Sequence, residues 1–298
     1  MHVSPSEYDT TRDDIANCVA NRVELLWPGW CELGYRRNKR EGIMYVAPSV
    51  LILFFLTIYP VVYSVYLSLF DIRGWAVTGA SFAGLSNYLK VLSDPLFLRS
   101  LRFTALYACL ALVIELPIGL LLAFLLNELA ESRPRIVKPI TVLILLPILF
   151  PGVATAMMFR LMLNDLIGVI PHIIELLFGA RVSLVSEPLS ASLVLVAVDV
   201  WQWTPFFFLL IYSGFRALPR EVMEAAQIDG AGYLRALRHV SLPMLRLVIM
   251  IALVLRGIWL FRSFDVPRLL TGGGPGTTTR TVSMQIYQYS FNQGLIGL

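Results

Sequence analysis

The chain has 298 residues, of which 57% are hydrophobic and only 15% are charged, and its mean hydropathy is +0.72. Soluble domains average roughly 45–50% apolar and about 25% charged residues, so this composition excludes an ordinary soluble enzyme. The formal net charge of +4 is therefore interpreted loop by loop as a topology signal, and not as a nucleic-acid footprint. The three cysteines form no C-x-x-C pair, and they predict neither a zinc site nor a disulfide framework.

The first 42 residues are polar and charged. They lack the apolar stretch of a signal peptide, so we expect a polar cytoplasmic tail at residues 1–42 and one membrane domain over residues 43–298. An interfacial helix around Trp27 and Trp30 would be interrupted by Pro28-Gly29. The tail therefore receives no functional assignment.

Five apolar segments follow, each of a length that can cross a bilayer. A transmembrane helix needs about 20 predominantly apolar residues. The segments lie at residues 43–70, 101–126, 140–159, 189–215 and 245–261. We therefore expect an all-α membrane protein whose core is a bundle of five transmembrane helices.

Prolines recur inside these apolar segments. Each proline removes one helix hydrogen-bond donor, and helices broken in this way are common in transporters. Proline is also simply more frequent in membrane helices than in soluble ones, so both interpretations stay open. The six prolines are Pro48, Pro60, Pro117, Pro147, Pro151 and Pro205.

The basic residues predict the orientation of the bundle. Of the 24 Lys and Arg residues, 14 lie on the same side as the N-terminus, nine lie on the other side, and Arg256 lies within a segment. Because cytoplasmic loops carry an excess of basic residues, we expect a cytoplasmic N-terminus. Residues 216–246 would then be cytoplasmic, and the loops near residues 80–95 and 268–285 would be external.

Three ionisable residues lie deep in the apolar segments: Glu115, Asp199 and Arg256. Each costs roughly 2.5 to 3.5 kcal/mol at the membrane centre, so each is expected to face a cavity, a partner or the protein interior. They therefore mark either a substrate pathway or a structural ion pair between helices. Trp201 and Trp203 are candidate sugar-stacking residues or, alternatively, interfacial anchors, and Trp203 lies one helical turn from Asp199.

The chain lacks the phosphate-binding loop with which an ATPase binds ATP. A phosphate-binding loop needs a Gly-Lys step, but the three lysines follow Asn38, Leu89 and Val137. The glycine-rich residues 271–276 lack the lysine and predict a tight turn instead. The histidines show no H-E-x-x-H spacing that would suggest metal catalysis. We expect a non-catalytic subunit without a cofactor, so any ATPase is a separate chain.

Residues 218–243, between the fourth and fifth segments, predict a cytoplasmic helix-turn-helix. Pro219 suits a helix start, Asp229-Gly230 suits a turn, and Pro243 is expected to end the second helix. One side of this hairpin is apolar and must be buried against headgroups, the bundle or another protein. A short helix of small residues that carries Glu224 suits a protein groove better than a bilayer.

The spacing of residues in this hairpin resembles the cytoplasmic signature of binding-protein-dependent ABC importer permeases. The signature residues are Glu224-Ala225-Ala226, Gly230, Val240 and Leu242-Pro243, with Val240 in place of the usual isoleucine. Residues 43–298 as a whole resemble the carbohydrate-uptake, maltose-type branch of that family. Supporting matches are Ala47-Pro48, Tyr59-Pro60, Phe82-x-Gly84-Leu85-x-Asn87-Tyr88, Trp201-x-x-x-Pro205-Phe206, Phe264-Asp265 and Thr271-Gly272-Gly273-Gly274-Pro275.

The resemblance implies a set of partners. The hairpin would dock into a cleft of an ATP-binding subunit, with Glu224 as an anionic contact, Ala225 and Ala226 permitting close approach, and Asp229-Gly230 forming the turn. A second permease, two ATP-binding subunits that hold ATP and Mg, and an extracytoplasmic binding protein would complete a sugar importer of the bacterial inner membrane. The family core has six spans, and the sixth is expected beyond Gly294. The resemblance therefore implies a domain that is incomplete at its C-terminus, or one with five spans.

Two other classes of protein compete with this interpretation. An ion-coupled secondary transporter would use Glu115 and Asp199 as proton or cation sites. A membrane enzyme is disfavoured, because no nucleophile–base or metal arrangement is present in the sequence. Within the carbohydrate branch, the sequence does not distinguish disaccharides, longer sugars, polyols and glycerol phosphates.

Overall fold

The structure is a computed structural model that describes residues 39–72, 74, 80–179, 182–230 and 232–298. Most of the tail predicted at residues 1–42, including Trp27 and Trp30, lies outside the described residues. The chain divides into two units, Met1–Tyr66 and Leu67–Leu298. Each unit is considered by itself.

The first unit contains the first predicted span. Helix α2 (Lys39–Leu53) continues through a π-helical turn, η1 (Phe54–Ile58), into α3 (Tyr59–Ser68), whose last two residues belong to the second unit. The N–H of Tyr59 bonds to the carbonyl of Phe54, a wider ring than in an α-helix, directly before Pro60. Since Pro60 has no N–H to offer, the π turn lets the helix continue past it.

In the part of the second unit that the structure describes, the regular elements are helices apart from one two-residue antiparallel pair, in which Phe70 faces Phe82 and Asp71 faces Ser81. Its elements in chain order are β1 (Phe70–Asp71), β2 (Ser81–Phe82), α4 (Ser86–Ser93), α5 (Pro95–Ser132), α6 (Pro134–Leu145), η2 (Pro147–Leu149), α7 (Gly152–Met162), α8 (Val169–Phe178), α9 (Pro188–Ala217), α10 (Arg220–Ile228), α11 (Tyr233–Ala236), η3 (Leu237–Ser241), α12 (Leu242–Phe261), α13 (Asp265–Leu270), α14 (Val282–Tyr287) and η4 (Gln288–Asn292).

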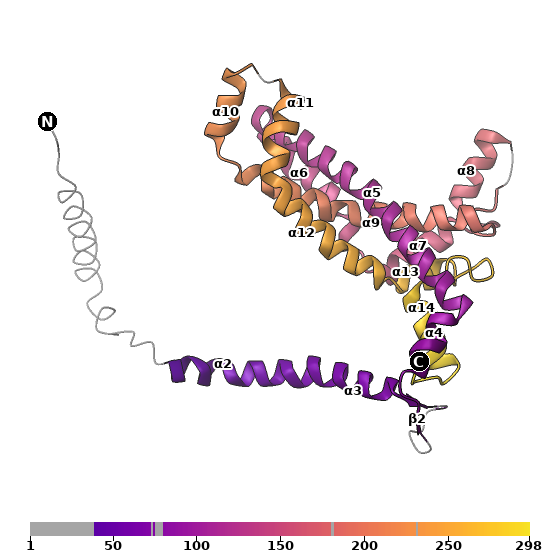
Figure 1. The fold of residues 1–298 in the computed structure, drawn as a ribbon. Coiled ribbons are helices and arrows are strands. Elements are labelled where there is room, and N and C mark those ends of the chain that lie inside the picture. Colours follow the sequence, from indigo (N-terminus) through magenta and orange to yellow (C-terminus); the bar gives the residue numbers. More distant parts are fainter. Residues whose placement is uncertain (1–38, 73, 75–79, 180–181, 231) are drawn as a thin grey trace. The chain divides into compact units, whose positions relative to one another are not determined.

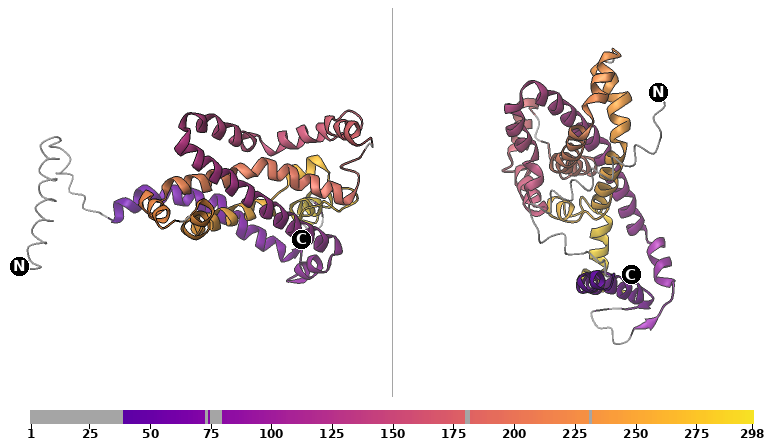
Figure 2. Two further views of the ribbon diagram at one scale, coloured as in Figure 1. Left: turned by 90° about the horizontal axis from the view of Figure 1, so that it is seen from above. Right: turned by 90° about the vertical axis from the view of Figure 1, so that its left-hand side faces the viewer.

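The core of this unit is formed by α5, α9 and α12, which pack side by side along one direction (Figures 1 and 2). Two glycines permit the close approach. A Cβ at Gly119 of α5 would lie 2.6 Å from Cβ of Phe207 on α9, and a Cβ at Gly214 of α9 would lie 2.7 Å from Leu245 on α12. Small residues at such crossings let membrane helices pack closely without a hydrophobic driving force between them.

Helix α6 and the turn η2 pack along the core helices, and most of the other short elements lie toward the two ends of these helices. Figure 1 shows α10 and α11 at one end, near the start of α6, and α4, α8, α13 and α14 toward the opposite end. The glycine-rich stretch forms the turn predicted for it, because Gly272, Gly273 and Gly276 have φ values of 65°, 85° and 61°. Thr279 ties this turn by donating its hydroxyl to the carbonyl of Gly274 at 2.6 Å.

Among the described residues, four helices are long and apolar enough to cross a membrane. They lie at Met44–Ser68, Pro95–Ala130, Pro188–Ala217 and Leu237–Leu270. The all-α membrane fold is thus confirmed, but the third predicted span, at residues 140–159, is discontinuous. It consists of α6, the 3-10 turn η2 and α7.

The prolines therefore behave in two ways. Pro147 and Pro151 break the third span, because Pro147 opens the 3-10 turn and Pro151 precedes α7. Pro117 and Pro205 instead lie inside the uninterrupted helices α5 and α9. Two closely spaced prolines break a helix here, whereas single prolines leave α5, α9 and also the exposed helix α2, which contains Pro48, continuous.

Candidate functional site

Three buried charged residues meet at the centre of the core. They come one from each core helix: Glu115 from α5, Asp199 from α9 and Arg256 from α12. Arg256 donates from Nε to Oε2 of Glu115 at 2.9 Å and from Nη2 to Oε1 at 2.8 Å. The same Nη2 also donates to Oδ2 of Asp199. The three side chains retain only 0%, 4% and 2% of their surface, respectively.

This geometry explains how the membrane-embedded charges are tolerated. Removing an ion from water costs several kcal/mol, and an ion pair offsets that cost only with good geometry and satisfied hydrogen bonds. The planar guanidinium of Arg256 supplies both, since it binds Glu115 through two parallel bonds. We name Glu115, Asp199 and Arg256 the charge cluster.

An aromatic group borders the charge cluster. Cζ of Arg256 lies 4.7 Å from the ring centre of Trp203. Trp203 contacts Trp259 with ring centres 4.9 Å apart, and Trp259 contacts Phe206 at 5.1 Å. Trp203 is fixed by its contact with Arg256, whereas Trp259 is 39% exposed and forms the accessible side of this group. We name Trp203, Phe206 and Trp259 the aromatic surface.

Trp201 does not belong to this surface. Its ring lies 5.3 Å from that of Phe159 on α7 and 6.3 Å from that of Phe150. Residues two positions apart on a helix point in nearly opposite directions, so Trp201 and Trp203 contact different neighbours. The sequence interpretation that treated them as one pair is wrong in this respect.

The predicted helix-turn-helix is present at the end of the bundle. Glu224, Ala225 and Ala226 lie in α10, and the turn at Asp229-Gly230 has Gly230 at φ 78°. Ala226 is buried, whereas Ile228 is 86% exposed. The hairpin therefore presents an apolar residue to its surroundings at the tip of α10.

The second helix of the hairpin does not end at Pro243, and this prediction is wrong. Helix α11 continues through the π turn η3 into α12, and Leu242-Pro243 forms the first two residues of α12. The N–H of Leu242 bonds to the carbonyl of Leu237, directly before Pro243. The same device precedes Pro60, and here it makes the hairpin continuous with the helix that carries Arg256.

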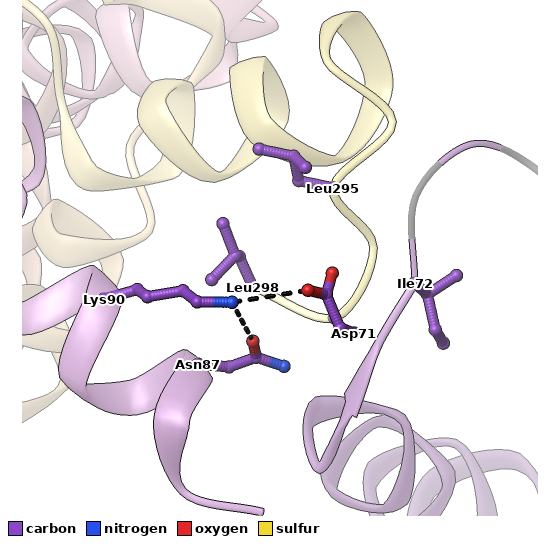
Figure 3. Close-up of a pocket in the computed structure, with 7 residues that line it drawn as sticks. Asp71, Ile72, Asn87, Lys90, Leu295 and Leu298 are labelled. Carbon is purple, nitrogen blue, oxygen red and sulfur yellow. Dashed lines mark hydrogen bonds and ion pairs between the residues drawn. The ribbon is translucent and has the colours of Figure 1, made fainter. Parts of the chain in front are cut away.

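A pocket of about 280 Å³ is lined by residues of the β1 segment, of α4 and of the C-terminal end (Figure 3), and Figure 1 shows α4 and the C-terminus at the end of the unit opposite α10. Its polar lining is internally paired, because Lys90 contacts Asp71 and the Oδ1 of Asn87, each at 3.4 Å. Nδ2 of Asn87 donates to the carbonyls of Ser68 and Phe70 at 3.0 and 2.9 Å. This pairing indicates that Asn87 fixes the segment after α3 onto α4. Within the parts of the chain that the structure describes, no group of three or more His, Cys, Asp or Glu side chains is placed to hold a metal.

Comparison with known families decides what this bundle belongs to. Residues 115–298, which include the charge cluster, the aromatic surface and the hairpin, match the family described as binding-protein-dependent transport system inner membrane component. The chain belongs to this permease family. The permease is accordingly an integral membrane protein.

Curated relatives extend the match to almost the whole permease. It is 34% identical over 268 residues to the trehalose/maltose transport system permease protein MalF of Thermococcus litoralis, which covers 90% of this chain and 88% of the relative. It is 31% identical to the trehalose transport system permease protein SugA of Mycobacterium tuberculosis, over 88% of this chain and 82% of that one. It is 30% identical to the sulfoquinovosyl glycerol transport system permease protein SmoG of Agrobacterium fabrum, over 88% and 83%.

A solved structure has the same fold. A chain of the bacterial alginate ABC transporter, in complex with an alginate pentasaccharide-bound periplasmic protein, matches with a TM-score of 0.74. The two chains are 19% identical, and the match covers 89% of the permease and 88% of that chain. The likeness at this level of identity establishes the fold of the permease and nothing finer.

The structure brings together every residue that the sequence placed in a substrate pathway: Glu115, Asp199, Trp203 and Arg256. Sequence reasoning missed Phe206 and Trp259. Helical spacing could have identified both residues. Phe206 lies three residues after Trp203, and Trp259 lies three residues after Arg256, so each shares a helix face with a predicted pathway residue. The hairpin residues occupy a separate location at the end of the same helices.

Proposed function

We propose that the permease is the membrane subunit of an ATP-driven importer that carries a sugar or a related polyol by alternating access. The observation that carries this proposal is its identity of 30% or more, over most of its length, to permeases named for trehalose, maltose and sulfoquinovosyl glycerol. All of these are carbohydrates or glycosides. Their shared chemistry supports the cargo class.

The same proposal includes the partners. A second permease subunit would complete the pathway, two ATP-binding subunits would bind ATP and Mg, and an extracytoplasmic binding protein would deliver the sugar. The permease itself would be non-catalytic. It would lie in a bacterial inner membrane with a cytoplasmic N-terminus and cytoplasmic residues 216–246.

The hairpin of α10 and α11 would be the docking element for an ATP-binding subunit. Glu224, Ala225, Asp229 and Gly230 would form its docking edge, and Ala226, which is buried within the permease, would permit close packing beneath that edge. Val240 and Leu242-Pro243 would join it to α12. Val240 and Arg256 are 16 residues apart on one continuous helix, about 24 Å at 1.5 Å per residue. A displacement of the hairpin would therefore act directly on the charge cluster.

The aromatic surface would be the wall against which the sugar stacks. Sugars offer flat apolar faces between their hydroxyl groups, and an aromatic ring in a binding site contributes a rigid apolar surface of the same shape. The guanidinium of Arg256 lies over the Trp203 ring, and its ion pairs with Glu115 and Asp199 fix its position. In this proposal the charge cluster lines the pathway by positioning the ring.

The alternative of an ion-coupled transporter finds no support in the comparisons. The geometry also disfavours ion coupling. The carboxylates that would bind the ion are those of Glu115 and Asp199, and both already accept hydrogen bonds from Arg256. A carboxylate in a buried ion pair exchanges a proton or cation only by breaking that pair.

The cargo class is tested by uptake of labelled solutes into vesicles that contain the complete transporter. A panel of disaccharides, polyols and amino acids should give uptake with at least one carbohydrate and none with the amino acids. Uptake of an amino acid, with no carbohydrate competing for it, would contradict the proposed cargo class.

A further inference from the structure

Helix α8 (Val169–Phe178) runs across the direction of the core helices. Figure 1 shows it rising beside α7 at the end of the bundle opposite α10 and α11, and the view from above in Figure 2 agrees. Because the long apolar helices follow the membrane normal, an element that crosses them at their ends lies along the membrane surface. Its ten residues are also too few to span a bilayer.

The loop before α8 is built to expose two aliphatic side chains. Oδ1 of Asn164 accepts hydrogen bonds from the N–H groups of Leu166 and Ile167 at 3.0 and 3.2 Å. Gly168 donates its N–H to the carbonyl of Asn164 at 2.8 Å, and a Cβ at Gly168 would lie 2.4 Å from that oxygen. This rigid turn leaves Leu166 81% and Ile167 76% exposed.

Helix α8 itself has three different sides. Ile170 packs against the core, and Pro171 is buried. His172 and Glu175 form a polar pair, 4.0 Å between Nδ1 and Oε2. The remaining side is an exposed apolar stripe of Val169, Ile173, Leu176 and Leu177, and Phe178 is exposed at the end of the helix.

We propose that α8 and the Leu166-Ile167 loop are an interfacial anchor, embedded in the headgroup–acyl boundary of the leaflet at this end of the bundle. A transverse helix with one apolar stripe and one polar side is the form that binds a lipid surface. The exposed polar residues Asn164 and Asp165 lie between α7 and α8, so α8 begins at the polar boundary of the apolar helix α7. Lipid is therefore the occupant, because α8 joins α7 to the membrane-spanning helix α9 at the level where apolar side chains give way to polar ones.

The anchor extends beyond the transport role of the permease. Helix α7 is the second half of the discontinuous span, and α8 joins it to α9, which carries Asp199 and Trp203. Fixing α8 at the membrane surface would hold the outer end of the broken span at a constant depth while the other helices move.

Nitroxide accessibility tests this directly in the complete transporter, reconstituted in vesicles of phosphatidylcholine and phosphatidylglycerol. The background carries Cys18→Ser, Cys31→Ser and Cys109→Ser. Leu177→Cys is labelled on the apolar stripe, and Glu175→Cys is the matched control two residues away. We expect oxygen collisions to exceed those of a water-soluble nickel chelate at position 177, and the reverse at position 175.

Two outcomes would overturn the anchor. A label at position 177 that the nickel chelate reaches as readily as at position 175 would place α8 in water. A label that neither reagent reaches would place a protein partner on the stripe. Ile173→Cys, with His172→Cys as its control, repeats the comparison on the same faces should the first pair disturb folding. Neither measurement depends on transport, so failure of the proposed function leaves the test intact.

Discussion

Arg256 on α12 and Glu115 on α5 lie 141 residues apart in the sequence and are joined by two parallel hydrogen bonds of 2.9 and 2.8 Å. This pair, with Asp199, connects all three core helices at one point. The guanidinium also supports Trp203. The stability of the bundle and the shape of the proposed sugar surface therefore depend on the same side chain.

Breaking the charge cluster at one member should destabilise the permease. Arg256→Met leaves two carboxylates buried without their partner, and loss of one member of a buried pair costs about 3–5 kcal/mol. Combining it with Glu115→Gln and Asp199→Asn removes the unpaired charges and should recover much of the loss. Thermal unfolding in detergent measures both variants. Equal melting temperatures for Arg256→Met and the unmodified chain would show that the cluster contributes nothing to stability.

The two neighbouring tryptophans should differ in their effect on transport. Trp203→Ala removes the supported ring of the aromatic surface, and we expect KM for the sugar to rise about tenfold, which corresponds to about 1.4 kcal/mol. Trp201→Ala is the matched control, because Trp201 contacts Phe159 and Phe150 instead. Uptake kinetics in vesicles compare the two. The sugar surface is misplaced if both variants transport with unchanged KM.

The turn of the hairpin should require glycine at one position only. Gly230 has φ 78°, where any other residue is strained by roughly 1–2 kcal/mol, so Gly230→Ala should distort the turn and reduce ATP-dependent uptake. Gly232→Ala is the control, since its φ is not positive and a Cβ there meets no atom within 4 Å. Glu224→Lys should reduce uptake by reversing the charge at the docking edge. Normal coupling in Gly230→Ala and Glu224→Lys would remove the hairpin from the mechanism.

The close contact between α5 and α9 should require glycine at position 119. A Cβ at Gly119 would overlap Phe207, so Gly119→Ala should cost about 1–3 kcal/mol by overpacking. Gly257→Ala on α12 meets no atom within 4 Å and replaces a poor helix former, so it should be neutral or stabilising. Melting temperatures of the two variants test this, and a lower value for Gly257→Ala than for Gly119→Ala would contradict the packing.

Much of the architecture was predictable, because membrane physics leaves few solutions. Apolar length predicts helices, and the cost of burying charge predicts that Glu115, Asp199 and Arg256 share an environment. The features that the sequence could not predict depend on local backbone hydrogen bonding and on helix length. Pro243 was expected to end a helix, but a π turn from Leu237 lets the helix continue. Helix α8 escaped notice because it is too short to be recognised as a span.

Topology can be probed with single cysteines at exposed positions. Ile228 on the hairpin is 86% exposed and Ser86 at the start of α4 is also exposed, whereas Ser241 is buried and would label poorly. An impermeant thiol reagent added to intact cells should label Ser86→Cys and leave Ile228→Cys unlabelled until the cells are broken. Labelling in the opposite order would invert the proposed orientation.

The most direct test of the account is the energy source of uptake. Vesicles containing the permease with its second permease subunit, ATP-binding subunits and sugar-loaded binding protein are assayed with ATP inside, with and without ionophores that abolish ion gradients. We predict that sugar uptake requires ATP hydrolysis and survives the ionophores. Uptake that persists with a catalytically inactive ATP-binding subunit and collapses with the ion gradient would contradict the account.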